Sequence, residues 1–203
     1  MNPSLKVYGD SRSGNCYKVK LVCAELGIEY QWQEVDILAG ETRRPQFLAL
    51  NANGKIPLLE LADGRCLPES NAIIAYLADG GALCGDSAFE RATVLQWMFF
   101  EQYSHEPYIA TSRFIIQYLG NPPERRAALL EKKAPGYGAL DVMEQQLARS
   151  PFLAGEKFTL ADISLYAYTH VAEEGGFELA AYPAIRSWIE RIEARPGYVP
   201  MFS

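Results

Sequence analysis

The chain has 203 residues, of which 49% are hydrophobic and 22% charged, as is typical of a globular protein with one large domain or two modest ones. Its formal net charge of −6, without any basic run, argues against a nucleic-acid partner, because phosphate contacts need clustered Lys and Arg. With no apolar stretch of about 18 residues and no signal-peptide pattern at the N-terminus, we expect a cytoplasmic protein that does not span a membrane.

The first part of the chain alternates between strand and helix patterns. From Asn15 to Leu26 apolar residues recur at helix spacing, and Gly27 is a typical helix end. Ala62-Asp63-Gly64 separates two short apolar runs and indicates a β-hairpin. The expected elements are a strand at 5–8, a helix at 15–26, a strand at 30–35, a helix at 44–50, paired strands at 58–61 and 65–67, and a helix at 70–78.

The second part of the chain is predicted to be entirely helical. The glycine-containing segment 81–87 has no periodic pattern, so we expect it to link a domain at 1–80 to a domain at 88–203. Pro107 should kink or split the first long helix, because its ring removes a backbone hydrogen bond and clashes with the preceding turn. Helices are expected at 89–119, 124–149, 161–174 and 182–195.

A capping-box pattern precedes the third of these helices. Thr159-Leu160-Ala161-Asp162 places an acid three residues after a threonine, and the helix that follows is apolar on nearly every side. We expect Asp162 to stabilise the start of a buried helix rather than to take part in chemistry.

The cysteines and histidines predict neither disulfides nor a metal site. Cys16 and Cys23 lie roughly 10 Å apart along one predicted helix, which is too far for a disulfide. No C-x-x-C pair occurs, so we expect all four cysteines to be reduced thiols. The only histidines, His105 and His170, are far apart in the sequence and far from any cysteine cluster.

Two short segments carry the strongest functional signal. In Lys55-Ile56-Pro57-Leu58 the proline belongs at a strand's first position or at an edge, which leaves the N–H and C=O of Ile56 open to a second extended peptide. In Glu69-Ser70-Asn71-Ala72-Ile73, Ser70 opens a helix, where its hydroxyl and the free N–H groups can bind an anion. A backbone clamp beside a carboxylate-binding helix end suits a small peptide ligand.

Together with Ser13-Gly14-Asn15-Cys16 and Phe158-Thr159-Leu160-Ala161-Asp162, these segments closely resemble the cytosolic glutathione transferases, over essentially the whole chain. The resemblance is to bacterial members with a serine-type site. It implies an α/β plus all-α fold: a thioredoxin-like N-terminal domain (βαβαββα) followed by an all-helical C-terminal domain. It also implies a homodimer in which the glutathione thiolate attacks an apolar electrophile, with glutathione as co-substrate and no other cofactor.

Ser13 is the favoured donor to the glutathione sulfur. The thiolate is the reactive form, and Ser13 lies between the first strand and the first helix, where N–H groups point outward. The resemblance implies this role, and Asn15 is a candidate for a second, amide donor. Ser11 competes with Ser13, and the alternative for either serine is an ordinary turn or cap residue. Ser13-x-x-Cys16 copies C-x-x-C spacing with serine first, so we expect Cys16 to be an inert core thiol, with redox chemistry as the alternative.

The resemblance also assigns partners to the rest of the tripeptide. Ser70 is expected to bind the γ-glutamyl carboxylate, and Glu69 the γ-glutamyl ammonium group. Ile56 would pair its backbone with the cysteinyl unit, and the resemblance implies that Pro57 is cis. For Glu69 the alternative is a solvated acid near a helix start.

The glycine carboxylate of the tripeptide needs a cation. Arg43 and Lys55 are the candidates, and Thr42 stands where relatives often have histidine. Either cation is equally explained as a solvated surface charge.

The second substrate is expected to contact Tyr103 and Tyr108 near Pro107, across the domain cleft, although aromatic residues at helical spacing are more often core. Two other functions stay open. One is a glutathione-dependent disulfide reductase, in which glutathione supplies both thiols. The other is a non-catalytic binding module, which would have no need to keep an intact ligand clamp.

Overall fold

The computed structural model describes residues 5–202, which divide into two compact units. The first unit contains the described residues up to Gly80 and also those from Pro196 onward, and the second unit is Gly81–Arg195. The sequence predicts that the end of the chain belongs to the helical domain, whereas the structure groups it with the first unit. There the hydroxyl of Tyr17 donates to the carbonyl of Val199 at 2.7 Å.

The first unit has the predicted thioredoxin-like order of strands and helices. Its sheet has the strand order β2-β1-β3-β4, in which β1 and β2 are parallel and the other pairs are antiparallel. Every predicted element is present. The elements are β1 (Lys6–Gly9), α1 (Gly14–Leu26), β2 (Gln31–Glu34), α2 (Pro45–Leu50), β3 (Leu58–Glu60), β4 (Cys66–Pro68) and α3 (Ser70–Leu77).

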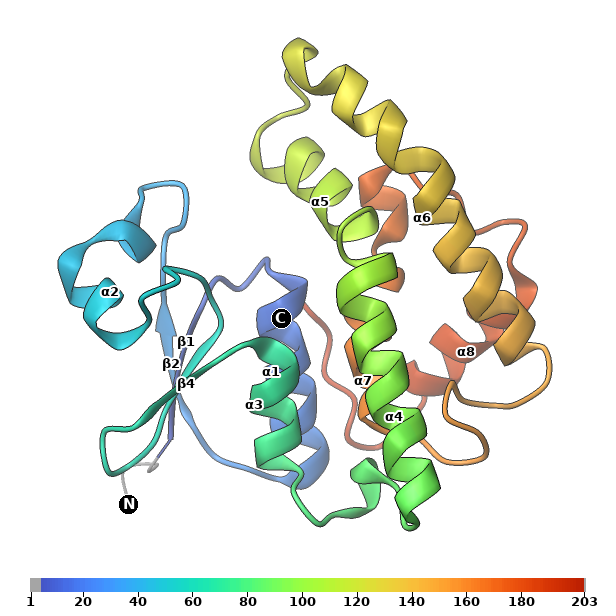
Figure 1. The fold of residues 1–203 in the computed structure, drawn as a ribbon, viewed down its shortest axis with the longest axis horizontal. Helices are drawn as coiled ribbons and strands as arrows, with labels where there is room; N and C mark the ends of the chain where they lie inside the picture. Colours follow the sequence, from blue (N-terminus) through green and yellow to red (C-terminus); the bar gives the residue numbers. More distant parts are fainter. Residues whose placement is uncertain (1–4, 203) are drawn as a thin grey trace. The chain divides into compact units, whose positions relative to one another are not determined.

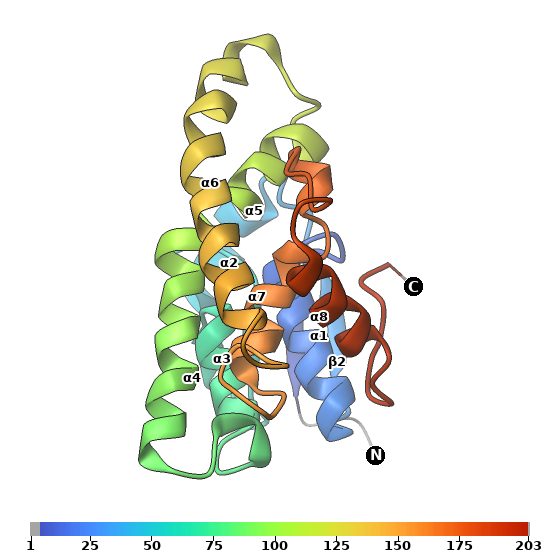
Figure 2. The ribbon, with the colours of Figure 1, turned by 90° about the vertical axis from the view of Figure 1, so that its right-hand side faces the viewer.

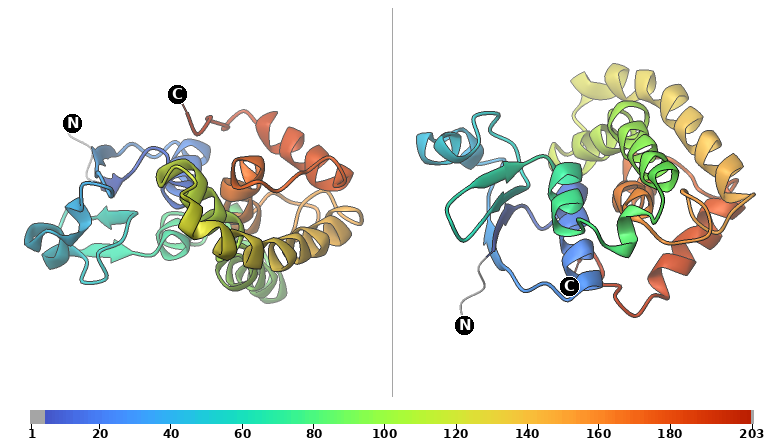
Figure 3. Two further views of the ribbon diagram at one scale, coloured as in Figure 1. Left: turned by 90° about the horizontal axis from the view of Figure 1, so that it is seen from above. Right: turned by 60° about the horizontal axis from the view of Figure 1, so that its bottom comes forward.

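Helices α1 and α3 cover one face of this sheet, and α2 lies against the other (Figure 1; Figure 3). Since side chains alternate along a strand, Tyr8 and Leu58 face α2, where they pack near Phe47. Gly9 faces α1. A Cβ at Gly9 would lie 2.8 Å from the sulfur of Cys16, so only glycine allows α1 to pack this closely on β1.

The second unit is helical, as the sequence predicts. The α-helices of the second unit are α4 (Ala88–Phe100), α5 (Ile109–Arg113), α6 (Arg126–Leu147), α7 (Leu160–Thr169) and α8 (Pro183–Glu193). Across residues 5–202, no helix is long and apolar enough to cross a membrane.

The helix predicted at 89–119 is broken at Pro107, and two π-helical turns flank the break, at Glu101–His105 and Phe114–Tyr118. Pro107 has no N–H, and the backbone beside it shifts to the wider bonding pattern. The N–H of Glu106 donates to the carbonyl of Glu101, and that of Thr111 donates to the carbonyl of Glu106. The predicted break at Pro107 is confirmed, whereas the sequence does not predict the π-helical turns.

Helix α7 is the core of the helical unit, and Figure 2 shows α4, α6 and α8 around it. Every residue of α7 is buried. The capping box is confirmed, because Asp162 accepts the N–H of Thr159 at 2.9 Å. The same carboxylate also accepts the N–H of Leu153 and the indole N–H of Trp188, both at 2.9 Å. Burial raises the pKa of Asp162 to about 6, while these hydrogen bonds favour the ionised form.

We expect Asp162→Asn to lower the free energy of unfolding by about 2–4 kcal/mol, measured by chemical denaturation at neutral pH. The amide nitrogen would face buried donors that the carboxylate now accepts, leaving at least one of them without a partner. Glu156→Gln, at an exposed acid of the same unit, is the control and should change stability by less than about 0.5 kcal/mol. A loss for Asp162→Asn no larger than that of the control would contradict the structural role.

Candidate functional site

The register of the sheet brings three loop ends of the first unit together. Leu58 of β3 pairs with Tyr8 of β1 on one side and with Pro68 of β4 on the other. Because β3 is antiparallel to both neighbours, the residue before β3 lies beside the residue after β4. Pro57 is thus next to Glu69, and the loop that leaves β1 toward α1 begins at the same end of the sheet.

Ser13 is the N-cap of α1, and its side chain is partly exposed. Its backbone is extended, and its hydroxyl oxygen accepts the N–H of Cys16 at 3.4 Å. Asp10, which is buried, shapes the loop: its carbonyl accepts the N–H of Ser13 at 3.0 Å and its carboxylate accepts the N–H of Arg12 at 2.8 Å. The loop therefore presents a serine hydroxyl at the N-terminal end of a helix, where the helix dipole favours negative charge.

Ser11, the competing donor, is hydrogen-bonded to Glu34 of β2. Its N–H and its hydroxyl both donate to the carboxylate of Glu34, at 2.8 and 3.2 Å. The hydroxyl proton of Ser11 is therefore engaged in a charge-assisted bond, which favours Ser13 as the donor to a ligand.

Cys16 is fully buried between β1 and α1. Burial raises the pKa of its thiol to about 12, although the neighbouring hydroxyl of Ser13 opposes the shift. The thiol is thus protonated at neutral pH and has no access to solvent, which favours the inert-core interpretation over a redox role. All four cysteines of the chain are free thiols.

Ser70 and Asn15 meet where α3 begins. Ser70 is buried, and its hydroxyl donates a hydrogen bond to the side-chain oxygen of Asn15 at 3.1 Å. The same hydroxyl accepts a hydrogen bond from the ammonium group of Lys18 at 3.4 Å. Glu69 precedes the helix with φ of 73°, a left-handed conformation that is uncommon outside glycine, and its side chain is exposed. The structure therefore gathers Asn15, Glu69 and Ser70 beside the start of α1.

Ile56 and Pro57 lie directly before β3. The Ile56–Pro57 peptide bond is cis, as the resemblance implies. β3 is an internal strand of the sheet, so Pro57 takes the strand-start position rather than an edge. Within residues 5–202 the N–H and C=O of Ile56 make no backbone hydrogen bond, which leaves both groups available to a peptide.

Arg43 and Lys55, the candidate cations, flank one turn. Arg43 donates to the carbonyl of Asn53 at 3.2 Å, and Asn51 donates its side-chain N–H to the carbonyl of Lys55 at 2.8 Å. Both cationic side chains are exposed. The turn directly precedes Ile56, so either cation is near the open backbone of that residue.

Tyr103 and Tyr108 line one pocket of the helical unit, with a volume of about 340 Å³. Tyr103 is 86% exposed, so it is not a core residue. The other lining residues come from the end of α4, the π-helical turn after it and α6: Phe100, Ser104, Pro135, Gly138, Ala139 and Val142.

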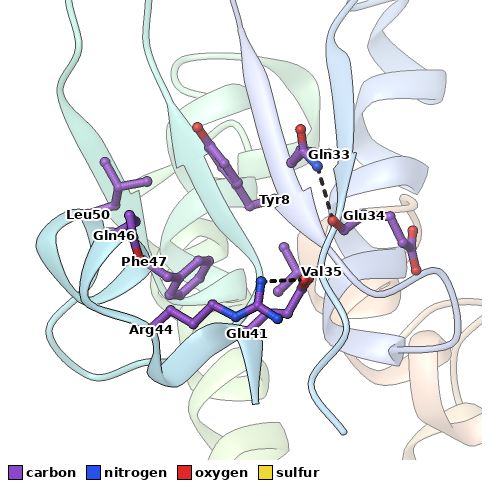
Figure 4. Close-up of a pocket in the computed structure, with 9 residues that line it drawn as sticks. All are labelled: Tyr8, Gln33, Glu34, Val35, Glu41, Arg44, Gln46, Phe47 and Leu50. Atoms are coloured by element: carbon purple, nitrogen blue, oxygen red, sulfur yellow. Dashed lines mark hydrogen bonds and ion pairs between the residues drawn. The ribbon is translucent and has the colours of Figure 1, made fainter. Parts of the chain in front are cut away.

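A larger cavity, of about 470 Å³, lies between α2 and the sheet, and none of the predicted site residues lines it (Figure 4). Arg44 and Glu41 form an ion pair of 2.9 Å at its rim. Among residues 5–202 no three His, Cys, Asp or Glu side chains are grouped so that they could hold a metal ion.

Two residues near the site are not among the predicted site residues. Asp10 orders the loop before Ser13, and Lys18 reaches Ser70. For Lys18 a signal does exist, because it falls on the same helix face as Asn15. For Asp10 the sequence offers no such signal.

Comparisons with known proteins identify the family of this chain. Residues 12–79 match the family of glutathione S-transferase N-terminal domains, and residues 96–196 match the C-terminal domains. Glutathione S-transferase 3 of Zea mays is 37% identical, covering 96% of this chain and 91% of the maize protein. The disulfide-bond oxidoreductase YfcG of Escherichia coli is 31% identical, covering 90% of this chain and 87% of that protein. A crystal structure of a glutathione S-transferase from Pseudomonas fluorescens is 58% identical, with a TM-score of 0.97, covering 98% of this chain and 100% of that chain. The chain therefore belongs to the glutathione S-transferase family.

Proposed function

We propose that this protein conjugates glutathione to electrophilic carbon atoms of small apolar compounds. The observation that carries the proposal is the convergence of three features at one end of the sheet. These are the hydroxyl of Ser13 at the N-terminus of α1, the open backbone of Ile56, and Ser70 at the start of α3. Together they match the thiol, the main chain and the γ-glutamyl end of glutathione.

In the proposed reaction Ser13 stabilises the glutathione thiolate. A free thiol titrates near pH 8.5, so a shift to about 6.5 needs roughly 2.7 kcal/mol. One hydrogen bond to a charged acceptor supplies about 1.5–3 kcal/mol, and the N-terminus of α1 adds to it. The proton leaves to solvent, the sulfur forms a bond to carbon, and the leaving group departs with the electron pair of the bond that breaks. Asn15 is the candidate for a second donor.

The other site residues are proposed to hold the tripeptide. Ile56, beside the cis Pro57, would pair with the cysteinyl unit through its backbone. Ser70 would bind the γ-glutamyl carboxylate, and Glu69 the ammonium group. Arg43 or Lys55 would neutralise the glycine carboxylate.

The remaining parts of the proposal concern the second substrate and the assembly. The domain at 1–80 would bind glutathione, and the pocket with Tyr103 and Tyr108 in the domain at 88–203 is the candidate for the apolar compound. We also propose a cytoplasmic homodimer. Phe89 and Phe99 of α4, which are 82% and 68% exposed, provide apolar surface that supports contact between copies.

Disulfide reduction is the second candidate, because the YfcG relative is named a disulfide-bond oxidoreductase. Here the bound thiolate attacks a disulfide sulfur, forms a mixed disulfide and releases a thiolate, and a second glutathione resolves the mixed disulfide. The burial and raised pKa of Cys16 mean that glutathione must supply both thiols.

The two reactions are separated by assaying the purified protein, with glutathione, against chlorodinitrobenzene and against hydroxyethyl disulfide. We expect turnover of the chloroarene, because the pocket with Tyr103 and Tyr108 is the candidate site for an apolar compound. Turnover of the disulfide alone would replace conjugation by disulfide reduction. Failure to turn over either compound, with retention on immobilised glutathione, would favour a binding module.

Ser13→Ala should lower kcat about ten-fold or more, which corresponds to loss of roughly 1.4 kcal/mol, and leave the KM for glutathione within a few-fold. Ser13→Gly lacks the same hydroxyl but disturbs a helix N-cap less, so an equal loss in both variants excludes a capping effect. Ser11→Ala is the matched control, because the hydroxyl of Ser11 is bound to Glu34. A larger loss in Ser11→Ala than in Ser13→Ala would transfer the role to Ser11.

A further inference from the structure

Asp10 holds the loop before Ser13 through both its backbone and its side chain. Its carbonyl accepts the N–H of Ser13 at 3.0 Å, which closes a β-turn from Asp10 to Ser13. Its carboxylate accepts the N–H of Arg12 at 2.8 Å and the guanidinium group of Arg12 at 3.2 and 3.3 Å. Just before the turn, the carbonyl of Gly9 accepts the N–H of Val35 at 2.8 Å. The turn therefore starts from a backbone that is itself bonded to the chain leaving β2.

The same side-chain motif occurs a second time in the first unit, in the hairpin between β3 and β4. There the carboxylate of Asp63 accepts the N–H of Arg65 at 3.0 Å and its guanidinium group at 2.7 Å. The side chain of Asp63 is 53% exposed, whereas that of Asp10 is 2% exposed. An exposed aspartate is thus enough to form such a turn, and burial of a carboxylate costs free energy. Because water cannot compete for a buried acceptor, its hydrogen bonds are stronger and hold the turn in one conformation.

We propose that Asp10 is a positioning residue that fixes the hydroxyl of Ser13 where it meets the sulfur of glutathione. This inference rests on the proposed function. The turn leaves Ser13 in an extended conformation, with φ of −81° and ψ of 124°, as the N-cap of α1. A hydroxyl that is already held in place stabilises the thiolate without being ordered during the reaction. Since Asp10 is buried, it acts through Ser13 rather than by contact with the ligand.

The test compares Asp10→Ala and Asp10→Asn with the unaltered protein. Asp10→Ala loses the side-chain acceptor, so kcat with the electrophile that the protein turns over should fall about ten-fold, while the KM for glutathione stays within about two-fold. The pKa of the bound glutathione thiol, followed by the ultraviolet absorption of the thiolate, should rise by about one unit. Asp10→Asn keeps an oxygen that accepts the N–H of Arg12, so kcat should stay within about two-fold.

The double variant Asp10→Ala/Ser13→Ala separates positioning from general support of the fold. If Asp10 acts through Ser13, kcat of the double variant stays within about two-fold of that of Ser13→Ala, because the hydroxyl to be positioned is absent.

Asp63→Ala is the matched control, because it removes the exposed copy of the motif at the opposite end of the sheet from Pro57 and Glu69. It should leave kcat and the thiol pKa unchanged. Thermal unfolding monitors the folding of every variant. Asp10→Ser, which keeps a weaker acceptor, replaces Asp10→Ala if that variant does not fold, and should lower kcat about five-fold.

Losses that add in the double variant would make Asp10 a purely structural residue and overturn the inference. Unchanged kcat and thiol pKa in Asp10→Ala would overturn it as well, as would an equal loss in Asp10→Asn. If the unaltered protein bound no glutathione, the proposed function itself would fail, and the inference with it. Binding to the unaltered protein is measured first, so the two failures are distinguishable.

Discussion

The candidate site depends on the pairing of β3 with both of its neighbours. Leu58 is fixed opposite Tyr8 and opposite Pro68, so the start of β3, the end of β4 and the exit from β1 lie at one end of the sheet. A slip of one residue in either pairing would turn Leu58 away from Phe47 toward the face that α1 and α3 cover, which the packing of α2 opposes. The same apolar contacts that stabilise the sheet therefore keep Pro57 beside Glu69.

The second constraint is electrostatic. The protein carries a net charge of −6, yet the site lies at the N-termini of α1 and α3, neither of which has an acid in its first turn. Both helices thus present positive ends, and buried Lys18 adds a full charge. Glu69, in its left-handed conformation, places one exposed carboxylate beside these groups. This distribution complements a ligand that has a thiolate, carboxylates and one ammonium group.

Local patterns predicted most of the fold, because strand alternation, helix spacing, turn residues and the capping box are short-range signals. The register that unites Ile56 and Ser70 is long-range. The two segments predict a backbone clamp beside a helix end, but not the strand pairs that bring them together. The choice between Ser13 and Ser11 depends on Glu34 of β2, because its carboxylate accepts the hydroxyl proton of Ser11. A proline predicts the break in the helix, but not the wider hydrogen-bonding pattern of the π-helical turns on either side of it.

The first unit alone accounts for glutathione binding and thiolate formation in the proposed mechanism. Those steps are the same whether the electrophile is carbon or sulfur, so the residues around Ser13 do not select between conjugation and disulfide reduction. Burial of Cys16 removes the one protein thiol near the site from either reaction. Under the proposal, selection comes from how the second substrate is held. The phenol rings of Tyr103 and Tyr108 can pack on an apolar compound while their hydroxyl groups stay in water. Under the proposal, the exposure of Tyr103, rather than the chemistry of the thiolate, is the property that favours a broad range of apolar electrophiles.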